Sequence, residues 1–340
     1  MRVLQAGMDK SGNYWLWRIL RLLMDEAKIP QKSWILNDPI YQVSKTWTLS
    51  FPEATELDVI TWDTAPALAY EGDSYDKQPL RERAYYYCVI PMYRRRIQDL
   101  DEYVRANTHL WTHAPWHDNL PRELLGGIDK VVYIVRDPRD VIVSGAHYVD
   151  SEYCRREFGI PRIPLAHRFK RLLRNCPEWA VHVAGWVGHG PAIDLHIVSY
   201  EGLVTDLPFQ LRRLAAYLGL DLSDSQLERV VEQVAFDSMK SAAKGAHVRK
   251  GTVGNWKNEL PEQIAGEATA ILRPLLDLLG YQDMSGGLSS FLTRGELSGE
   301  IMAALAQINA LQLRARERLA PAPSARGTGT MRPASFSGWG

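Results

Sequence analysis

An arginine and a serine in the middle of the chain could bind the same anion. Residues 131–135 form an apolar run typical of a β-strand, and Arg136 follows it directly. An Asp-Pro pair then indicates a turn into a helix, and Ser144 lies near the start of that helix. A cation at a strand end and a hydroxyl near a helix start can hold one phosphate-like group. A purely structural strand–turn–helix joint would show the same Asp-Pro pair, so this segment alone leaves both interpretations open.

A loop near the N-terminus could bind an anion as well. Residues 3–6 have the character of a short strand and residues 14–24 have the apolar spacing of a helix, with Lys10, Ser11 and Gly12 between them. Backbone N–H groups at a helix start favour a negative charge, and Lys10 adds a mobile cation. The loop is not a Walker A motif, because there the lysine directly follows the second glycine, whereas Lys10 precedes Gly12.

A third basic stretch lies far downstream, at residues 249–257. It contains Arg249, Lys250 and Lys257, and Gly251 directly follows Lys250. Glycine allows the backbone to approach a ligand closely. Taken alone, the stretch is more readily interpreted as a solvated basic turn.

These three segments, in this order, resemble the cytosolic type of sulfotransferase that depends on 3′-phosphoadenosine 5′-phosphosulfate (PAPS). Residues 10–15, Lys-Ser-Gly-Asn-Tyr-Trp, are similar to that family's 5′-phosphosulfate loop, usually Lys-Ser-Gly-Thr-Thr-Trp. Residues 249–257 are close to its Arg-Lys-Gly-x-x-Gly-Asp-Trp-Lys signature. Three shorter segments also resemble the family: Thr-His-Ala-Pro at 112–115, Tyr-Glu-Gly-Leu at 200–203 and Phe-Asp-Ser-Met-Lys at 236–240. The resemblance runs from about residue 2 to about residue 280.

The resemblance implies a nucleotide site. Lys10 and its loop would hold the 5′-phosphosulfate, and Arg136 with Ser144 would hold the 3′-phosphate. Trp15 and Phe236 would stack on the adenine, although ordinary core packing would explain these two rings equally well. The residues expected to bind the nucleotide are Lys10, Ser11, Gly12, Asn13, Tyr14, Trp15, Arg136, Ser144, Tyr200, Phe236, Arg249, Lys250 and Gly251.

The resemblance also selects His113 as the general base. Histidine, whose ordinary pKa is near neutral, can take the acceptor proton while the acceptor oxygen attacks sulfur. Lys10 would stabilise the charge on the bridging oxygen as 3′-phosphoadenosine 5′-phosphate (PAP) leaves in line. His109 and His117 are rivals nearby, and only the Thr-His-x-Pro segment favours His113. The family needs no metal, and the sequence shows no convincing cluster of metal ligands.

Several positions depart from the family pattern. Asn13 and Tyr14 replace two threonines, and Asp9 stands where proline is usual, which places an acid beside Lys10. Trp111 stands where many members have a lysine, which removes a cation from the acceptor side. The family's dimer motif is not matched, so a homo-oligomer is neither predicted nor excluded.

The composition narrows the class of protein. The chain has 340 residues, of which 46% are hydrophobic, enough for a large α/β domain. Its 40 basic and 40 acidic residues give no net charge, which argues against broad nucleic-acid binding. Three cysteines without Cys-x-x-Cys spacing predict neither a disulfide framework nor a zinc site, and they fit a reducing cytoplasm. We expect no signal peptide and no transmembrane segment.

The order of the elements predicts the fold. The expected strands lie at 2–6, near 131–135 and near 195–199, and the expected helices at 14–25, 140–148 and 208–218. This alternation predicts a single α/β domain, residues 1–292, whose central, mainly parallel sheet is flanked by helices. Ligands of such sheets bind at the carboxyl ends of the strands, so Lys10, Arg136 and Tyr200 are expected to share one crevice.

Three segments lie outside this regular pattern. Residues 27–108 are less regular and rich in aromatic residues, and they would cover an acceptor pocket. Aromatic residues of this kind more often belong to the core, which is the alternative interpretation. Within this segment, a run of three arginines at 94–96 is either solvated or faces an anionic acceptor. An amphipathic helix is expected at 293–318 and a disordered tail at 319–340.

The predicted function is transfer of a sulfuryl group from PAPS to a hydroxyl or amine of a small-molecule or glycan acceptor. Two alternatives stay open. One is a protein that binds PAPS or PAP without turnover, which would not need His113 or Lys10. The other is a nucleotide-dependent kinase, which would require Mg²⁺.

Overall fold

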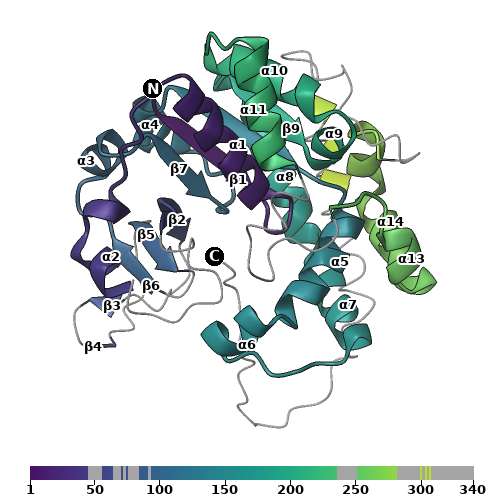
Figure 1. The fold of residues 1–340 in the computed structure, drawn as a ribbon. Helices are drawn as coiled ribbons and strands as arrows, with labels where there is room; N and C mark the ends of the chain where they lie inside the picture. Colours follow the sequence, from purple (N-terminus) through teal and green to yellow (C-terminus); the bar gives the residue numbers. More distant parts are fainter. Residues whose placement is uncertain are drawn as a thin grey trace.

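A computed structural model describes most of the chain. The described residues are 1–44, 56–63, 70–71, 74–75, 84–90, 93–235, 251–281, 299–300, 303–304 and 306–307. They form a sheet of seven strands with helices packed on its faces (Figure 1). Within this described part, no helix is long and apolar enough to cross a membrane.

The sheet is mainly parallel and has an antiparallel edge. Its strands, in spatial order, are β6 (Tyr93–Arg96), β5 (Ala84–Ile90), β2 (Val59–Asp63), β7 (His109–Thr112), β1 (Val3–Gly7), β8 (Lys130–Val135) and β9 (Leu195–Ser199). Strands β2, β7, β1, β8 and β9 pair in parallel, whereas β5 runs antiparallel to both of its neighbours. The predicted α/β fold is therefore confirmed. A separate two-stranded pair joins β3 (Tyr70–Glu71) and β4 (Ser74–Tyr75).

Strand β8 shows that the middle of the sheet is buried on both faces. Every side chain from 131 to 135 is at most 4% exposed. Val132 and Ile134 pack into the hydrophobic cluster on one face, and Val131, Tyr133 and Val135 pack into the cluster on the other. A continuous apolar run is what a strand needs when helices cover both faces of its sheet.

Helices cover both faces. On one face lie α1 (Asn13–Glu26), α10 (Leu207–Leu218) and α11 (Asp224–Val234), which meet in one cluster. On the other face lie α5 (Pro138–Val149), α7 (Leu165–Leu173), α8 (Cys176–His189) and α14 (Glu262–Leu278). Shorter elements connect them: η1 (Ile35–Asn37), α2 (Pro39–Ser44), α3 (Leu100–Arg105), α4 (Leu120–Glu123), η3 (Leu125–Gly127), α6 (Glu152–Phe158), η4 (Gly190–Ala192), α9 (Tyr200–Thr205) and α13 (Trp256–Glu259).

The segment 27–108 is more regular than predicted. It supplies β2, β5 and β6, and therefore three of the seven strands of the sheet. Because β5 is buried on both faces, it lacks the polar alternation that would indicate a strand. Its aromatic side chains belong to the core, with Tyr85, Tyr86 and Tyr87 at most 8% exposed.

Three further expectations concern the arginine run in β6 and the two C-terminal segments. Arg95 and Arg96 are exposed, and Arg95 Nη1 lies 3.4 Å from Asp38 Oδ1, whereas the side chain of Arg94 lies outside the described residues. The expected helix at 293–318 lies largely outside the described residues, of which 299–300, 303–304 and 306–307 are helical. The expected tail at 319–340 lies outside them as well.

Candidate active site

Four neighbouring strands bring the expected site residues to one edge of the sheet. β7 leads into His113, β1 into the loop at 8–12, β8 into Arg136, and β9 into Tyr200, the first residue of α9. Because these strands are parallel, their carboxyl ends lie at the same edge. The structure thus places the candidate base and the candidate anion-binding groups side by side.

The loop between β1 and α1 is shaped to hold an anion. Lys10 has φ of +66° and Gly12 has φ of +98°, with Ser11 between them. Alternation of left-handed and ordinary residues curves successive N–H groups into an anion-binding concavity, here at the start of a 14-residue helix. A Cβ at position 12 would lie 2.6 Å from Tyr200 Cδ2, so only glycine fits there.

A buried polar network supports this loop from within the sheet. Gln5 Nε2 donates a hydrogen bond to the Asn13 carbonyl at 2.7 Å, and Asn13 Nδ2 donates to the Met8 carbonyl at 2.8 Å. His109 Nε2 donates to Gln5 Oε1 at 3.2 Å, and burial lowers the pKa of His109 to about 3. His109 is therefore a neutral core residue. Asn13, in place of a threonine, fastens the loop with its amide.

The Lys10 side chain lies against an aromatic ring that was not expected at the site. Lys10 Nζ is 3.6 Å from the ring centroid of Tyr148, in the last turn of α5. Burial lowers the pKa of Lys10 to about 8, while the nearby Asp9 carboxylate acts in the opposite direction. Lys10 is therefore mostly charged at neutral pH. No motif in the sequence marks Tyr148, because its contact with Lys10 depends on the path of α5.

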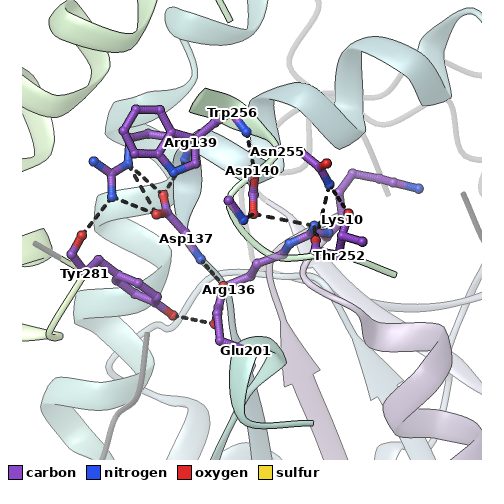
Figure 2. Close-up of polar contacts among 11 residues, drawn as sticks. Lys10, Arg136, Asp137, Arg139, Asp140, Glu201, Thr252, Asn255, Trp256 and Tyr281 are labelled. Atoms are coloured by element: carbon purple, nitrogen blue, oxygen red, sulfur yellow. Dashed lines mark hydrogen bonds and ion pairs between the residues drawn. The ribbon is translucent and has the colours of Figure 1, made fainter. Parts of the chain in front are cut away.

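Arg136 contacts the loop, the first residue of α9 and the downstream basic stretch (Figure 2). Its Nη1 donates to the Lys10 carbonyl at 3.2 Å, and its Nη2 donates to the Thr252 carbonyl at 3.4 Å. Its guanidinium carbon lies 3.9 Å from the ring centroid of Tyr200. Figure 2 shows the Lys10 side chain extending away from this arginine.

Asp140 fastens the downstream stretch to α5. Its Oδ2 accepts a hydrogen bond from the Gly254 N–H at 2.7 Å, and its Oδ1 accepts one from the Trp256 N–H at 2.9 Å (Figure 2). Gly251 has φ of +64°, a conformation that glycine adopts without strain. The sequence reasoning did not single out Asp140, although its place in the first turn of a helix that follows a candidate anion site could have suggested a role.

Several expected nucleotide contacts stay predictions. Phe236, Arg249 and Lys250 lie outside the described residues. Ser144 is half-buried in the middle of α5. Trp15 is 8% exposed, donates its indole N–H to the Val234 carbonyl at 2.8 Å, and lies edge-on to Tyr200 at 5.7 Å between ring centroids.

A buried polar network next to Arg136 joins Asp137, Arg139, Glu201 and Tyr281. Arg139 Nη2 contacts Asp137 Oδ2 at 2.7 Å and also donates to the Tyr281 carbonyl at 2.8 Å. Glu201 Oε1 accepts the Asp137 N–H at 3.0 Å, and Glu201 Oε2 accepts the Tyr281 hydroxyl at 3.2 Å (Figure 2). Burial raises the pKa of Glu201 to about 7.

Replacing Glu201 with glutamine is expected to remove part of the pH dependence of stability. In the unfolded chain this carboxyl ionises near its ordinary value of 4.5, whereas the folded protein holds the proton until about pH 7. Stability is therefore present at low pH and falls by about 2–3 kcal/mol as pH rises through this range. Thermal unfolding at pH 5 and pH 8 should show a smaller loss for Glu201→Gln than for the wild type. An equal loss in both proteins would contradict the shifted carboxyl.

His113 is oriented by hydrogen bonds on two sides. Its Nδ1 lies 2.7 Å from the Gly7 carbonyl oxygen, and its Nε2 lies 3.1 Å from Asp9 Oδ1. Its own carbonyl accepts a hydrogen bond from His182 Nε2 at 3.1 Å, and burial lowers the pKa of His182 to about 3. The contact with Asp9 was not expected, because the sequence places this acid next to Lys10 only.

The rival His117 belongs to a different part of the core. Its Nε2 lies 3.1 Å from the Tyr85 hydroxyl, which in turn donates to Glu123 Oε2 at 2.8 Å. With His109 buried behind the loop, His113 is the one of the three histidines that lies at the strand ends.

Aromatic rings stand beside His113. Trp111 lies edge-on to it, with 5.3 Å between ring centroids. Trp111 packs with Trp17 and Leu57, and Tyr14 stacks on Trp17 at 5.6 Å. Tyr14 therefore packs beside the cluster next to His113, and its expected role in nucleotide binding stays a prediction.

Comparison with known proteins identifies the family. Residues 1–280 match the family model described as the sulfotransferase domain. The chain belongs to this sulfotransferase family. This sulfotransferase-family protein is 22% identical over 196 residues to an amine sulfotransferase of Oryctolagus cuniculus, a match that covers 50% of this chain and 62% of that one. It is 31% identical over 144 residues to sulfotransferase 2B1 of Homo sapiens, covering 38% and 39%. The chain thus spans less than two thirds of the length of either relative.

Two solved structures also match this chain. Retinol dehydratase in a complex with retinol and PAP is 18% identical, covers 81% of this chain and 82% of its own, and gives a TM-score of 0.49. Mouse sulfotransferase SULT7A1 complexed with PAP is 18% identical, covers 80% and 83%, and gives a TM-score of 0.47.

Proposed function

We propose that this protein transfers a sulfuryl group from PAPS to the hydroxyl of a small-molecule acceptor and releases PAP. The observation that supports this most is that the anion-binding loop, Arg136 and His113 meet at one edge of the sheet. Membership in the sulfotransferase family agrees with this assignment.

The donor side carries buried hydrogen-bond donors suited to phosphate. Ser11 Oγ and Arg136 Nε are both buried, and neither has a hydrogen-bond partner among the described residues. Leaving a buried donor unsatisfied costs about 1–3 kcal/mol, and a phosphate oxygen would remove that cost. We therefore assign the loop at 10–13 to the 5′-phosphosulfate and Arg136 to the 3′-phosphate of PAPS.

The acceptor side carries the proposed base. Because a carbonyl oxygen only accepts, His113 Nδ1 donates to Gly7, and Nε2 is the nitrogen that can take a proton. As the acceptor oxygen forms its bond to sulfur, the bond from sulfur to the bridging phosphate oxygen breaks. The acceptor proton passes to His113 Nε2, and PAP leaves with the negative charge. Lys10, at the adjacent strand end, would stabilise that charge.

The proposal includes the extent and setting of the domain. The match to residues 1–280 supports one catalytic domain over about residues 1–292. Cys88, Cys154 and Cys176 are all buried and form no disulfide, which supports a reducing compartment such as the cytoplasm.

Titration calorimetry of the purified protein with PAP, without added metal, tests the donor assignment. We expect PAP to bind more tightly than adenosine 5′-phosphosulfate or ATP, because only PAP brings a 3′-phosphate to Arg136. A preference for ATP in a second titration with Mg²⁺ would support the kinase alternative. Assay of PAPS turnover with a panel of phenols then separates an enzyme from a protein that only binds the nucleotide.

A further inference from the structure

We infer that Asp9 selects acceptors that carry a protonated amine close to the reacting hydroxyl. This inference rests on the proposed function and names the substrate class of that same site. Asp9 lies between β1 and Lys10, and its side chain is 33% exposed. Its Oδ1 is 3.1 Å from His113 Nε2, the nitrogen that would take the acceptor proton.

The contact between Asp9 and His113 is favourable when the two side chains share a proton. His113 Nδ1 is already committed as a donor to the Gly7 carbonyl at 2.7 Å. In a neutral ring, Nε2 would then present a lone pair to a carboxylate, and two acceptors repel each other. A distance of 3.1 Å is therefore stable when one proton lies between the two atoms. In that state Nε2 cannot accept a proton from an acceptor hydroxyl.

Binding of an acceptor therefore changes the contacts of both His113 and Asp9. Its hydroxyl has to meet His113 Nε2, and the Asp9 carboxylate loses its partner at the same time. A neutral acceptor leaves that charge without a counter-charge, whereas an ammonium group on the acceptor takes the place of the imidazolium. The proton shared by the pair leaves to solvent, and His113 becomes a free base beside the hydroxyl.

The Asp9 carboxylate is open to a cationic group of the substrate. Among the described residues, Asp9 makes an ion pair with His113 and with no other side chain. Lys10, the next residue, points its Nζ at the Tyr148 ring, 3.6 Å from the centroid.

The rings beside His113 suit the same kind of ligand. Trp111 lies edge-on to His113, and the half-buried Tyr14 packs against the cluster that contains Trp111. A carboxylate next to aromatic rings is the combination that binds organic ammonium groups, through charge and cation–π attraction. The geometry therefore favours a phenol or alcohol that bears an aminoalkyl group.

Three phenols of similar size test this inference. They are 3-(aminomethyl)phenol, which is cationic, 3-ethylphenol, which is neutral, and (3-hydroxyphenyl)acetate, which is anionic, so that each substituent lies near the hydroxyl. Each is titrated into the PAP-saturated protein, and each is assayed for kcat/KM with PAPS. We expect the cationic phenol to bind about tenfold more tightly than the neutral one, with the anionic one weakest. The product should be a sulfate ester and not a sulfamate.

Two substitutions assign this preference to Asp9. In Asp9→Asn the ratio of kcat/KM for the cationic over the neutral phenol should fall about tenfold. In Asp9→Glu, which keeps the charge, much of the ratio should return. Asp221→Asn removes one exposed acid between α10 and α11 and controls for the general loss of negative charge. Thermal unfolding of each variant confirms that it is folded.

The outcomes separate the two proposals. The inference fails if the wild type binds the neutral phenol as tightly as the cationic one, if the cationic phenol does not bind at all, or if Asp9→Asn keeps the full preference. In each of these cases PAP binding and sulfation of any phenol would still support the proposed function. Failure to bind PAP would overturn both.

Discussion

Replacing His113 with alanine should reduce sulfuryl transfer by about a thousandfold, because a positioned general base contributes about 10²–10⁴ to the rate. PAP binding should change little, since the expected donor contacts come from Lys10 and Arg136. The measurement is single-turnover transfer from PAPS to a phenol, together with calorimetric titration of PAP. Under the proposed mechanism, only the first should be affected.

Two further substitutions sharpen this test. Asparagine at position 113 can still donate to the Gly7 carbonyl but cannot take a proton, so His113→Asn should be as inactive as His113→Ala. His167 is exposed on α7, and His167→Ala controls for the loss of a histidine elsewhere. Wild-type rates in His113→Ala would reject the base assignment. Loss of PAP binding together with transfer would indicate that His113 mainly supports the loop through Gly7.

Replacing Arg136 with alanine should weaken PAP binding by about a hundredfold. Hydrogen bonds to charged groups contribute about 1.5–3 kcal/mol, and the buried guanidinium has an unpartnered Nε to offer to the 3′-phosphate. Adenosine 5′-phosphosulfate lacks that phosphate, so its affinity should fall much less. Calorimetric titration of both nucleotides gives the comparison.

The structural role of Arg136 can be distinguished from its binding role. The same side chain donates to the Lys10 and Thr252 carbonyls, so its loss could also loosen the site. Arg136→Lys keeps the charge but not the planar fork, and it should bind PAP with intermediate affinity. Arg122→Ala, at an exposed position of α4, controls for net charge. Equal losses for both nucleotides, with a lower unfolding temperature, would remove Arg136 from the 3′-phosphate site.

The elements next to the anion-binding residues were predictable because their signals are local. The strand expected at 2–6 is Val3–Gly7, the helix expected at 140–148 is Pro138–Val149, and the helix expected at 208–218 is Leu207–Leu218. Strands buried on both faces are continuous apolar runs, and helices show their spacing within a few turns. The antiparallel edge of the sheet was missed, since β5 lacks the polar alternation that indicates a strand.

The sequence by itself determined the types of residue at the strand ends, and with them the anion-binding chemistry of Lys10 and Arg136. Only the tertiary structure decided which side chains meet there. Asp9 contacts His113, more than a hundred positions away, because β1 and β7 are neighbours in the sheet. Asp140 holds Gly254 across a similar separation, and Tyr148 reaches Lys10 from the end of α5. Spacing along the chain carries no signal for such contacts, because they depend on the order of the strands and on the path of the helices between them.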